Sequence, residues 1–202
     1  MGIRFLLLDI STAICYNTSV SKWFAGKLKG VCEMIEIKNI NGDVIYKHYE
    51  SLDRSDLTYE KLKFADLSNA NLSFTKLTGV NLFDADLSNA NLSYADFFGA
   101  DLTGANLSNC NLRSANLTNA NLRFANLNGA NLTNANLSDT DLSKADLSNC
   151  NLRGAELTGA YLRFANLNGA NLTNAKIDLT GVNSDIDLTG ANLTGAKIKR
   201  SV

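Results

Sequence analysis

A leucine recurs at every fifth residue from Leu52 to Ile177, and only Phe97 and the final isoleucine replace it. Two residues before each leucine, from Ala65 to Ala175, lies a small side chain that is alanine in most repeats. The residue directly before the leucine is mostly asparagine or aspartate. The repeating unit is therefore Ala-Asn/Asp-Leu followed by two variable residues.

A period of five suits neither a continuous helix nor a straight strand. In an α-helix five residues advance about 500°, so successive leucines would lie roughly 140° apart around the axis. In a strand, an odd period sends alternate leucines to opposite faces. A chain that turns a corner every five residues can instead point every leucine and every small residue inward. The repeat therefore predicts an all-β solenoid, a coil of short parallel sides.

A longer period of 20 residues sets the size of one coil. The tripeptide Leu-Ser-Asn begins at Leu67, Leu87, Leu107 and Leu147. Residues 20 apart are thus equivalent, which predicts four sides of five residues. Asparagine also precedes the leucine throughout one set of these equivalent positions, for which we expect a side-chain amide ladder: Asn71, Asn91, Asn111, Asn131, Asn151 and Asn171.

The second residue after each leucine predicts the corners. On two opposite sides it is Asn, Gly or Asp, which tolerate the positive φ of a type II turn. The other two sides carry larger residues there, for which we expect a different turn with negative φ: Phe64, Tyr94, Phe124, Lys144 and Phe164. Two corner types are predicted to alternate around the coil.

Residues 65–177 resemble the pentapeptide repeat family, and this resemblance covers more than half of the chain. It implies a right-handed quadrilateral β-helix. The handedness follows from the resemblance alone, because the spacing of the leucines is the same in either hand.

The chain divides into three predicted segments, residues 1–33, 34–50 and 51–199. Residues 1–33 are an N-terminal extension, in which Ser19 to Met34 has the pattern of a short basic amphipathic helix. That helix would either cover the open end of the coil or dock on a membrane surface or a partner. In bacterial and phage members of the family the segment that corresponds to Met34 often starts the protein, so residues 1–33 are an extension or a misassigned start.

Residues 34–50 are predicted to form a β-hairpin that caps the coil. Asn41-Gly42 is the preferred two-residue type I′ turn, and apolar residues alternate with polar ones on either side of it. Such a hairpin can pair with the first coil and cover its edge. The inward slots at Glu50, Ser55 and Glu60 suggest a degenerate first coil, with regular coils only from residue 65.

The repeat is predicted to be regular over 65–177 and irregular over 178–187. The interval from Ile177 to Leu188 is one residue longer than two repeats, so we expect a bulge or small loop at Asn183-Ser184-Asp185. Lys197, Lys199 and Arg200 then place charge on the last edge, which discourages strand addition.

No arrangement of residues predicts catalysis, a cofactor or a metal site. Cys110 and Cys150 occupy inward slots two coils apart, about 9.6 Å by strand spacing and too far for a disulfide. His48 is the single histidine and lies in the hairpin, remote from the cysteines. Asp66, Asp86 and Asp146 share one column and could hold a cation, but asparagine interrupts that column and favours a solvated ladder.

One surface has the composition of a binding site. Aromatic and arginine side chains are enriched at interaction hot spots. They recur on one side of the predicted coil, which gives the candidate partner contact Arg123, Phe124, Lys144, Arg163 and Phe164. The alternative is that bulky residues simply suit this corner, as Phe64 suggests.

These features favour a rigid, non-catalytic protein-interaction module whose partner the sequence does not identify. The alternative, implied by the resemblance, is a DNA mimic that binds DNA gyrase or another topoisomerase. A formal net charge of −1 argues against direct nucleic-acid binding. Asp9 cuts the first apolar run short of a signal peptide, and no segment is long enough to span a membrane. We expect a cytoplasmic monomer or end-to-end dimer.

Overall fold

The computed structural model describes residues 35–48, 52–178 and 186–199. The predicted helix at residues 19–34 and the predicted loop at residues 183–185 lie outside these ranges. Strands are few and short, because most of the coil pairs through single β-bridges. In chain order they are β1 (Ile35–Asn39), β2 (Val44–His48), β3 (Ala65–Asp66), β4 (Glu156–Leu157), β5 (Lys176–Asp178) and β6 (Lys197–Lys199).

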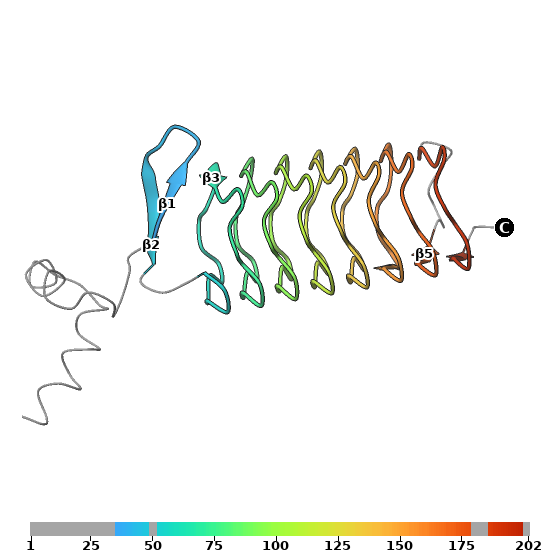
Figure 1. The fold of residues 1–202 in the computed structure, drawn as a ribbon, viewed down its shortest axis with the longest axis horizontal. Helices are drawn as coiled ribbons and strands as arrows, with labels where there is room; N and C mark the ends of the chain where they lie inside the picture. The colour runs from blue at the N-terminus through green and yellow to red at the C-terminus, as the bar shows by residue number, and fades with distance from the viewer. Residues whose placement is uncertain (1–34, 49–51, 179–185, 200–202) are drawn as a thin grey trace, which may run out of the picture.

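Parallel pairing between residues 20 apart runs along the repeats, from the bridge of Asp56 with Lys76 to that of Asn151 with Asn171. Figure 1 shows the resulting coils stacked in sequence order, with the hairpin at one end and the C-terminus at the other. The predicted β-solenoid and its period of 20 residues are confirmed.

The leucines and the small residues form one continuous interior. Leu92, Leu112 and Leu132 are each 0% exposed, and Phe97 is buried in a leucine position. From Ala85 to Ala175 the alanines two residues before the leucines are buried as well, so both inward slots are filled as the repeat predicts. Each buried leucine contributes about 1.5–3 kcal/mol before chain entropy is subtracted. This core is the main stabilising contribution.

Two threonines in the inward slots donate their hydroxyls to backbone carbonyls. The Thr75 hydroxyl donates to the carbonyl oxygen of Leu52 at 2.6 Å, and the Thr140 hydroxyl donates to that of Leu117 at 2.8 Å. Each acceptor lies 23 residues earlier, in the preceding coil. No buried side-chain nitrogen or oxygen of the described residues lacks a hydrogen-bond partner.

Every corner within the described ranges has positive φ, so the prediction of a second turn type with negative φ is wrong. The larger corner residues have positive φ, like the asparagines and glycines: Phe64 (φ 60), Tyr94 (φ 60), Phe124 (φ 62), Lys144 (φ 63) and Phe164 (φ 60).

The cause is the hydrogen bonding between coils. The corner N–H donates to a carbonyl of the next coil on every side, from Phe64 to Phe83 at 2.9 Å and from Asn69 to Ser88 at 2.8 Å. A non-glycine residue with positive φ costs about 1–2 kcal/mol. The hydrogen bonds between coils offset this cost. The hydrogen-bond network, and not the residue type, therefore sets the turn conformation.

The hairpin of β1 and β2 is antiparallel, as predicted, but its loop is longer than the two-residue turn. The Asn39 N–H donates to the Asp43 carbonyl at 2.8 Å, which leaves Ile40, Asn41 and Gly42 as the loop. Of these only Gly42 has positive φ (88°), whereas a type I′ turn needs it at both central residues. A register shift after Ile37 accompanies the three-residue loop.

The hairpin pairs with the first coil and covers its edge. Strand β1 is antiparallel to β3, with Lys38 opposite Asp66 and Asn39 opposite Ala65. The Ile37 side chain is buried in the same core as the leucines. In Figure 1 the hairpin stands against the N-terminal end of the stack.

The first coil is more regular than predicted. Leu57 and Leu62 are fully buried, and Lys61 already pairs with Asn81 in the common register. Ser55 fills its inward slot by donating its hydroxyl to the Leu52 carbonyl at 2.7 Å. Glu60 keeps part of its side chain in solvent, because no complete coil precedes it.

The last coil is displaced by one residue along the sequence, as predicted. Asn166 pairs with Asp187 and Asn171 with Asn192, which are 21 residues apart, and β5 pairs with β6 in the same register. The extra residue therefore falls between Asp178 and Asp187.

Candidate functional site

The predicted asparagine column forms an amide ladder in its N-terminal half. The side-chain amide of Asn91 donates to the Oδ1 of Asn71 at 3.1 Å, and Asn111 donates to Asn91 at 3.1 Å. Asn131 continues the ladder to Asn111 at 3.4 Å. Each Oδ1 also accepts a backbone N–H two residues later, as from Ser93 to Asn91 at 3.3 Å. The asparagine column therefore stabilises the turn within each coil and links each coil to its neighbours.

The aspartate column is part of the same scaffold. Asn106 donates its amide to Asp86 at 3.0 Å, and Asn166 donates to Asp146 at 3.0 Å. Within the described ranges, no cluster of three or more His, Cys, Asp or Glu side chains could hold a metal ion. Two of the asparagines that interrupt the column, Asn106 and Asn166, therefore bind its carboxylates directly.

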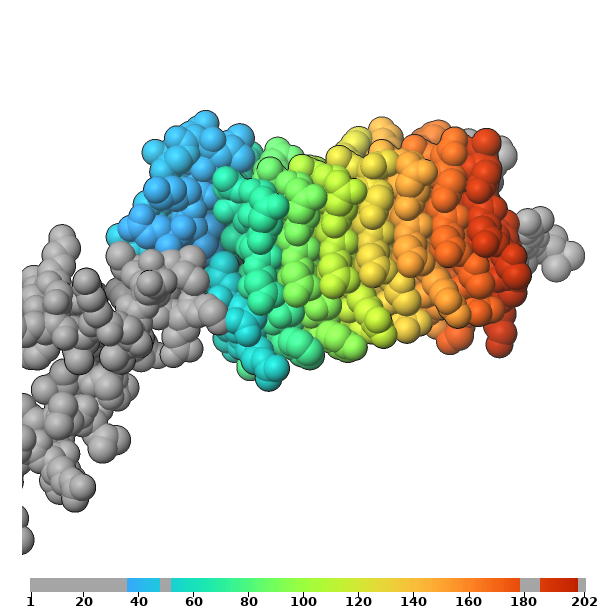
Figure 2. Space-filling view, in the orientation of Figure 1, coloured from blue at the N-terminus to red at the C-terminus, as the bar shows by residue number. Residues whose placement is uncertain are grey.

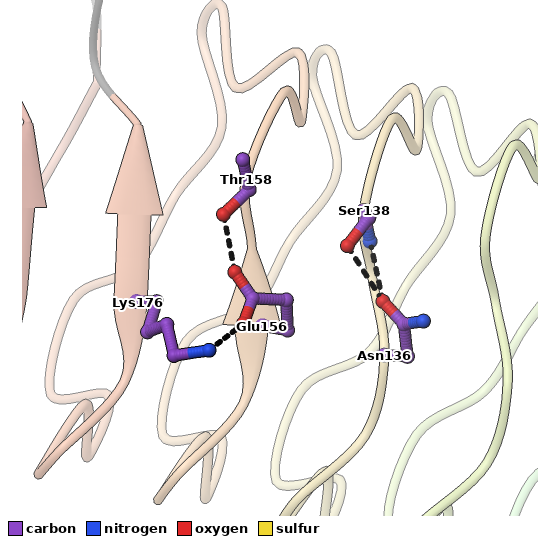
Figure 3. A network of polar contacts seen from close by, with 5 residues as sticks. All are labelled: Asn136, Ser138, Glu156, Thr158 and Lys176. Carbon is purple, nitrogen blue, oxygen red and sulfur yellow. Dashed lines mark hydrogen bonds and ion pairs between the residues drawn. The ribbon is translucent and has the colours of Figure 1, made fainter.

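Glu156 occupies the position that asparagine or aspartate holds in most repeats. In Figure 3 the regular pair is Asn136 and Ser138, whose N–H and hydroxyl donate to the same Asn136 oxygen. Glu156 accepts from the Thr158 hydroxyl on one oxygen and from Lys176 on the other. Burial opposes ionisation of Glu156, but the hydrogen bonds from Lys176 and Thr158 outweigh it and lower the pKa of the carboxyl group.

Two cysteines of the described ranges fill alanine slots. Cys110 and Cys150 are free and buried, and burial raises the pKa of each thiol to about 12. A neutral, enclosed thiol is a poor nucleophile. His48, at the end of β2, pairs through its backbone with Ile35 in the hairpin.

The candidate contact residues lie in three consecutive coils. The backbone N–H of Phe124 donates to Ser143, and that of Lys144 donates to Arg163, which places the three corners one above another. Phe124 is 52% exposed and Phe164 is 49% exposed. We call the group Arg123, Phe124, Lys144, Arg163 and Phe164 the aromatic–cation surface.

Cations lie over both phenyl rings of this surface. The Arg123 guanidinium is 5.7 Å and the Lys144 ammonium 5.1 Å from the centroid of the Phe124 ring. The Arg163 guanidinium is 4.8 Å from the centroid of the Phe164 ring. These contacts hold the rings in fixed orientations at the corner.

Sequence analysis missed two members of this area. Asp141 forms an ion pair with Arg123 at 3.7 Å. Tyr161 lies in the following coil, where its backbone forms a parallel β-bridge with Asp141, and it is 64% exposed. Tyr161 stands in a position otherwise held mostly by asparagine and aspartate. The large side chain of Tyr161 in that column was the sequence feature from which its exposure could have been predicted.

A second aromatic group lies in another column of corners, nearer the N-terminus, and was also missed. The rings of Phe74 and Tyr94 stack with centroids 4.8 Å apart and an angle of 3° between their planes. The Arg54 guanidinium covers the other face of this pair, 5.0 Å from the centroid of Phe74. The spacing of 20 residues between these three corner positions was the signal in the sequence. We call Arg54, Phe74 and Tyr94 the tyrosine stack.

The surface around these groups is a regular array of ridges. Figure 2 shows the coils as parallel ridges on the visible face, continuous with the hairpin at the N-terminal end. Side chains on this scaffold are therefore presented from a straight, repeating framework. No helix among the described residues is long and apolar enough to cross a membrane.

Comparison with known proteins identifies the repeat. The family model for pentapeptide repeats matches in 8 copies that together extend from residue 51 to residue 183. The chain belongs to the pentapeptide repeat family. A search of curated proteins found no significant match.

Solved structures of the same family are similar to this pentapeptide repeat protein. HetL, involved in heterocyst differentiation regulation in the cyanobacterium Nostoc sp. strain PCC 7120, is 29% identical over 73% of this chain and 84% of its own, with a TM-score of 0.25. A protein of the Arabidopsis thaliana thylakoid lumen is 28% identical over 62% and 66%, with a TM-score of 0.32. QnrB1, a plasmid-mediated fluoroquinolone resistance protein, is 28% identical over 72% and 85%, with a TM-score of 0.34.

Proposed function

We propose that this pentapeptide repeat protein is a rigid, non-catalytic interaction module that binds a protein partner through the aromatic–cation surface. The observation that carries this proposal is the pair of half-exposed rings, Phe124 and Phe164, each held by a cation over its face. Exposed aromatic side chains with arginine are the residues that most often dominate binding energy.

The scaffold supports this role because it orders the surface before a partner arrives. The corner backbone is bonded on both sides: Phe124 donates to Ser143, and Gly104 in the preceding coil donates to Arg123. The leucine core beneath is fully buried. A preordered surface loses little conformational entropy on binding, which favours affinity.

The test is retention of partners from a lysate of the native host. We expect the full chain to retain a specific protein that the double variant Phe124→Ser, Phe164→Ser loses. Phe64→Ser is the matched control, because Phe64 is an exposed corner phenylalanine that belongs to neither the aromatic–cation surface nor the tyrosine stack. Equal loss in the control, or retention by the double variant, would contradict the proposal.

We further propose that the coil is four-sided and right-handed, with the segments 1–33, 34–50 and 51–199 as its N-terminal extension, hairpin cap and solenoid. A turn after every leucine and pairing at 20 residues support four sides. A crystal structure would show whether the coil is right-handed.

We also propose a cytoplasmic location. It is supported by the free thiols of Cys110 and Cys150, and fractionation of the native host tests it.

A gyrase-directed role is the second candidate, and one column of repeats favours it. The repeats centred on Leu67, Leu87, Leu107, Leu127, Leu147, Leu167 and Leu188 contain several aspartates and no lysine or arginine. Such a side could imitate the charge of DNA. A supercoiling assay with and without a quinolone tests this candidate, and no effect at micromolar protein removes it.

A further inference from the structure

The tyrosine stack ends abruptly at a small residue. Arg54, Phe74 and Tyr94 occupy equivalent corners of successive coils, and the next corner in the column is Ser114. Tyr94 is 49% exposed although Phe74 covers one of its ring faces. The stack is therefore closed by Arg54 at one end and faces only a serine at the other.

The following corner does not fill the space above Ser114. Asn134 directs its side chain toward the coil after it, because a Cβ built on Gly154 would lie 2.4 Å from the Asn134 Oδ1. One planar group could thus continue the stack on Tyr94 at the same spacing of 4.8 Å that separates Phe74 from Tyr94.

An arginine lies in the coil next to this position. The backbone N–H of Tyr94 donates to the Arg113 carbonyl at 3.0 Å, so Arg113 lies in the coil directly after Tyr94. Its side chain is exposed, and among the described residues it forms no ion pair. Arg153, two coils further along the same column, is also exposed.

We propose that Tyr94, Arg113 and Ser114 form a second binding site, which takes an acidic protein segment. An aromatic side chain of that segment stacks on the open face of Tyr94, and a neighbouring carboxylate pairs with Arg113. Ring stacking fixes the planar group, and the guanidinium selects the negative charge.

The charge distribution favours a protein over a nucleic acid. Arg113 and Arg153 are separated by two coils, and the repeats on the preceding side of each coil carry Asp66, Asp86 and Asp146 without any cation. A nucleic acid needs a continuous row of cations along its phosphates. A short acidic segment needs only one or two. This site is separate from the aromatic–cation surface and does not depend on the proposed function.

The test is a nuclear magnetic resonance titration of the full-length, nitrogen-15-labelled chain. The probe is the peptide acetyl-Glu-Glu-Trp-Glu-Glu-amide, with acetyl-Gln-Gln-Trp-Gln-Gln-amide and oligothymidylate as comparisons. We expect saturable shifts at the backbone amides of Tyr94, Arg113 and Ser114 with the acidic peptide. The neutral peptide and oligothymidylate are expected to bind there at least about tenfold more weakly.

The variant Ser114→Tyr tests the binding site without disturbing the fold. Tyr59 and Tyr94 show that tyrosine is accepted at such corners with φ near 60°, so the variant should fold, extend the stack and occupy the site. We expect it to weaken peptide binding by roughly tenfold or more, and Arg113→Glu to do the same. Asn119→Tyr, a tyrosine at an equivalent corner of another side, should leave binding unchanged.

Several outcomes would overturn the proposal. These are the absence of saturable shifts, shifts centred instead on Phe124 and Phe164, equal binding of the neutral peptide, or tighter binding of oligothymidylate. Undiminished binding by Ser114→Tyr would overturn it as well.

Discussion

The thiol of Cys110 donates a 2.8 Å hydrogen bond to the backbone carbonyl oxygen of Leu87, one coil nearer the N-terminus. Cys150 makes the same contact with Leu127 at 2.9 Å. Each acceptor carbonyl also receives the N–H of its own turn, as from Ala90 to Leu87 at 3.0 Å. The inward slot therefore accepts alanine, threonine or cysteine without leaving a polar group unpaired.

Replacing both thiols with alanine should change how stability depends on pH. The pKa of Cys110 is raised by burial from 9.0 to about 12, and Cys150 behaves alike. The unfolded chain loses these protons first, so their contribution is complete below pH 9 and is lost as pH rises toward 12. The urea midpoint of the native chain should thus fall more between about pH 7.5 and about pH 10.5 than that of Cys110→Ala, Cys150→Ala. Equal falls would contradict the assignment.

Leu122→Asp should abolish cooperative folding. Leu122 is 0% exposed, and an unpaired buried carboxylate costs on the order of 3–5 kcal/mol in addition to the lost packing. That sum approaches the whole stability of a typical domain. Arg123→Ser, one residue away on the surface, should change the unfolding free energy by about 0.5 kcal/mol or less. Circular dichroism with urea denaturation measures both.

Two glycine corners should differ in their cost of substitution. Gly99 has positive φ and open space at its Cβ position, so Gly99→Ala should cost only the backbone strain of about 1–2 kcal/mol. At Gly104 the added Cβ would lie 2.0 Å from the Asp84 Oδ1, the end of an exposed side chain that must turn aside, so Gly104→Ala should cost slightly more. Removing the obstruction with Asp84→Ala should return Gly104→Ala to the cost at Gly99. A double-mutant cycle that shows no coupling would contradict this account.

Glu156→Gln should weaken the coil at neutral pH and lose its effect in acid. The hydrogen bonds from Lys176 and Thr158 more than offset the effect of burial and lower the pKa of Glu156 from 4.5, so its contribution is present above that value and disappears as pH falls through the folded-state pKa. The pair is solvent-exposed, so the expected difference is below about 1 kcal/mol. Thermal unfolding midpoints of both chains across this range should converge as the pH falls.

The interior of the coil could be predicted from sequence because one residue type marks it at every repeat. Leu92 and Leu112 show this, and so does the amide ladder of Asn71 and Asn91. The corners could not be predicted from residue type. Phe64 and Phe124 adopt positive φ because the hydrogen bonds between coils require it, and that constraint is absent from any single repeat.

The surface groups were predicted only in part. The candidate contact of Phe124 and Phe164 was visible as a recurrence of aromatic residues beside arginine. The stacking of Phe74 on Tyr94 depends on side-chain orientation across two coils, which sequence spacing alone does not give. Tyr161 is a single aromatic residue in a column of mostly asparagine and aspartate, so no recurrence marks it in the sequence.

The pairing of residues 20 apart makes this molecule a ruler with fixed graduations. Distance along its axis changes only in whole steps of about 4.8 Å, the separation of neighbouring strands. Duplicating one complete coil would therefore move two groups on the surface apart by one graduation, and removing one would bring them closer by the same amount. Each group would keep its own geometry. Spacing and chemistry can vary independently in such a chain.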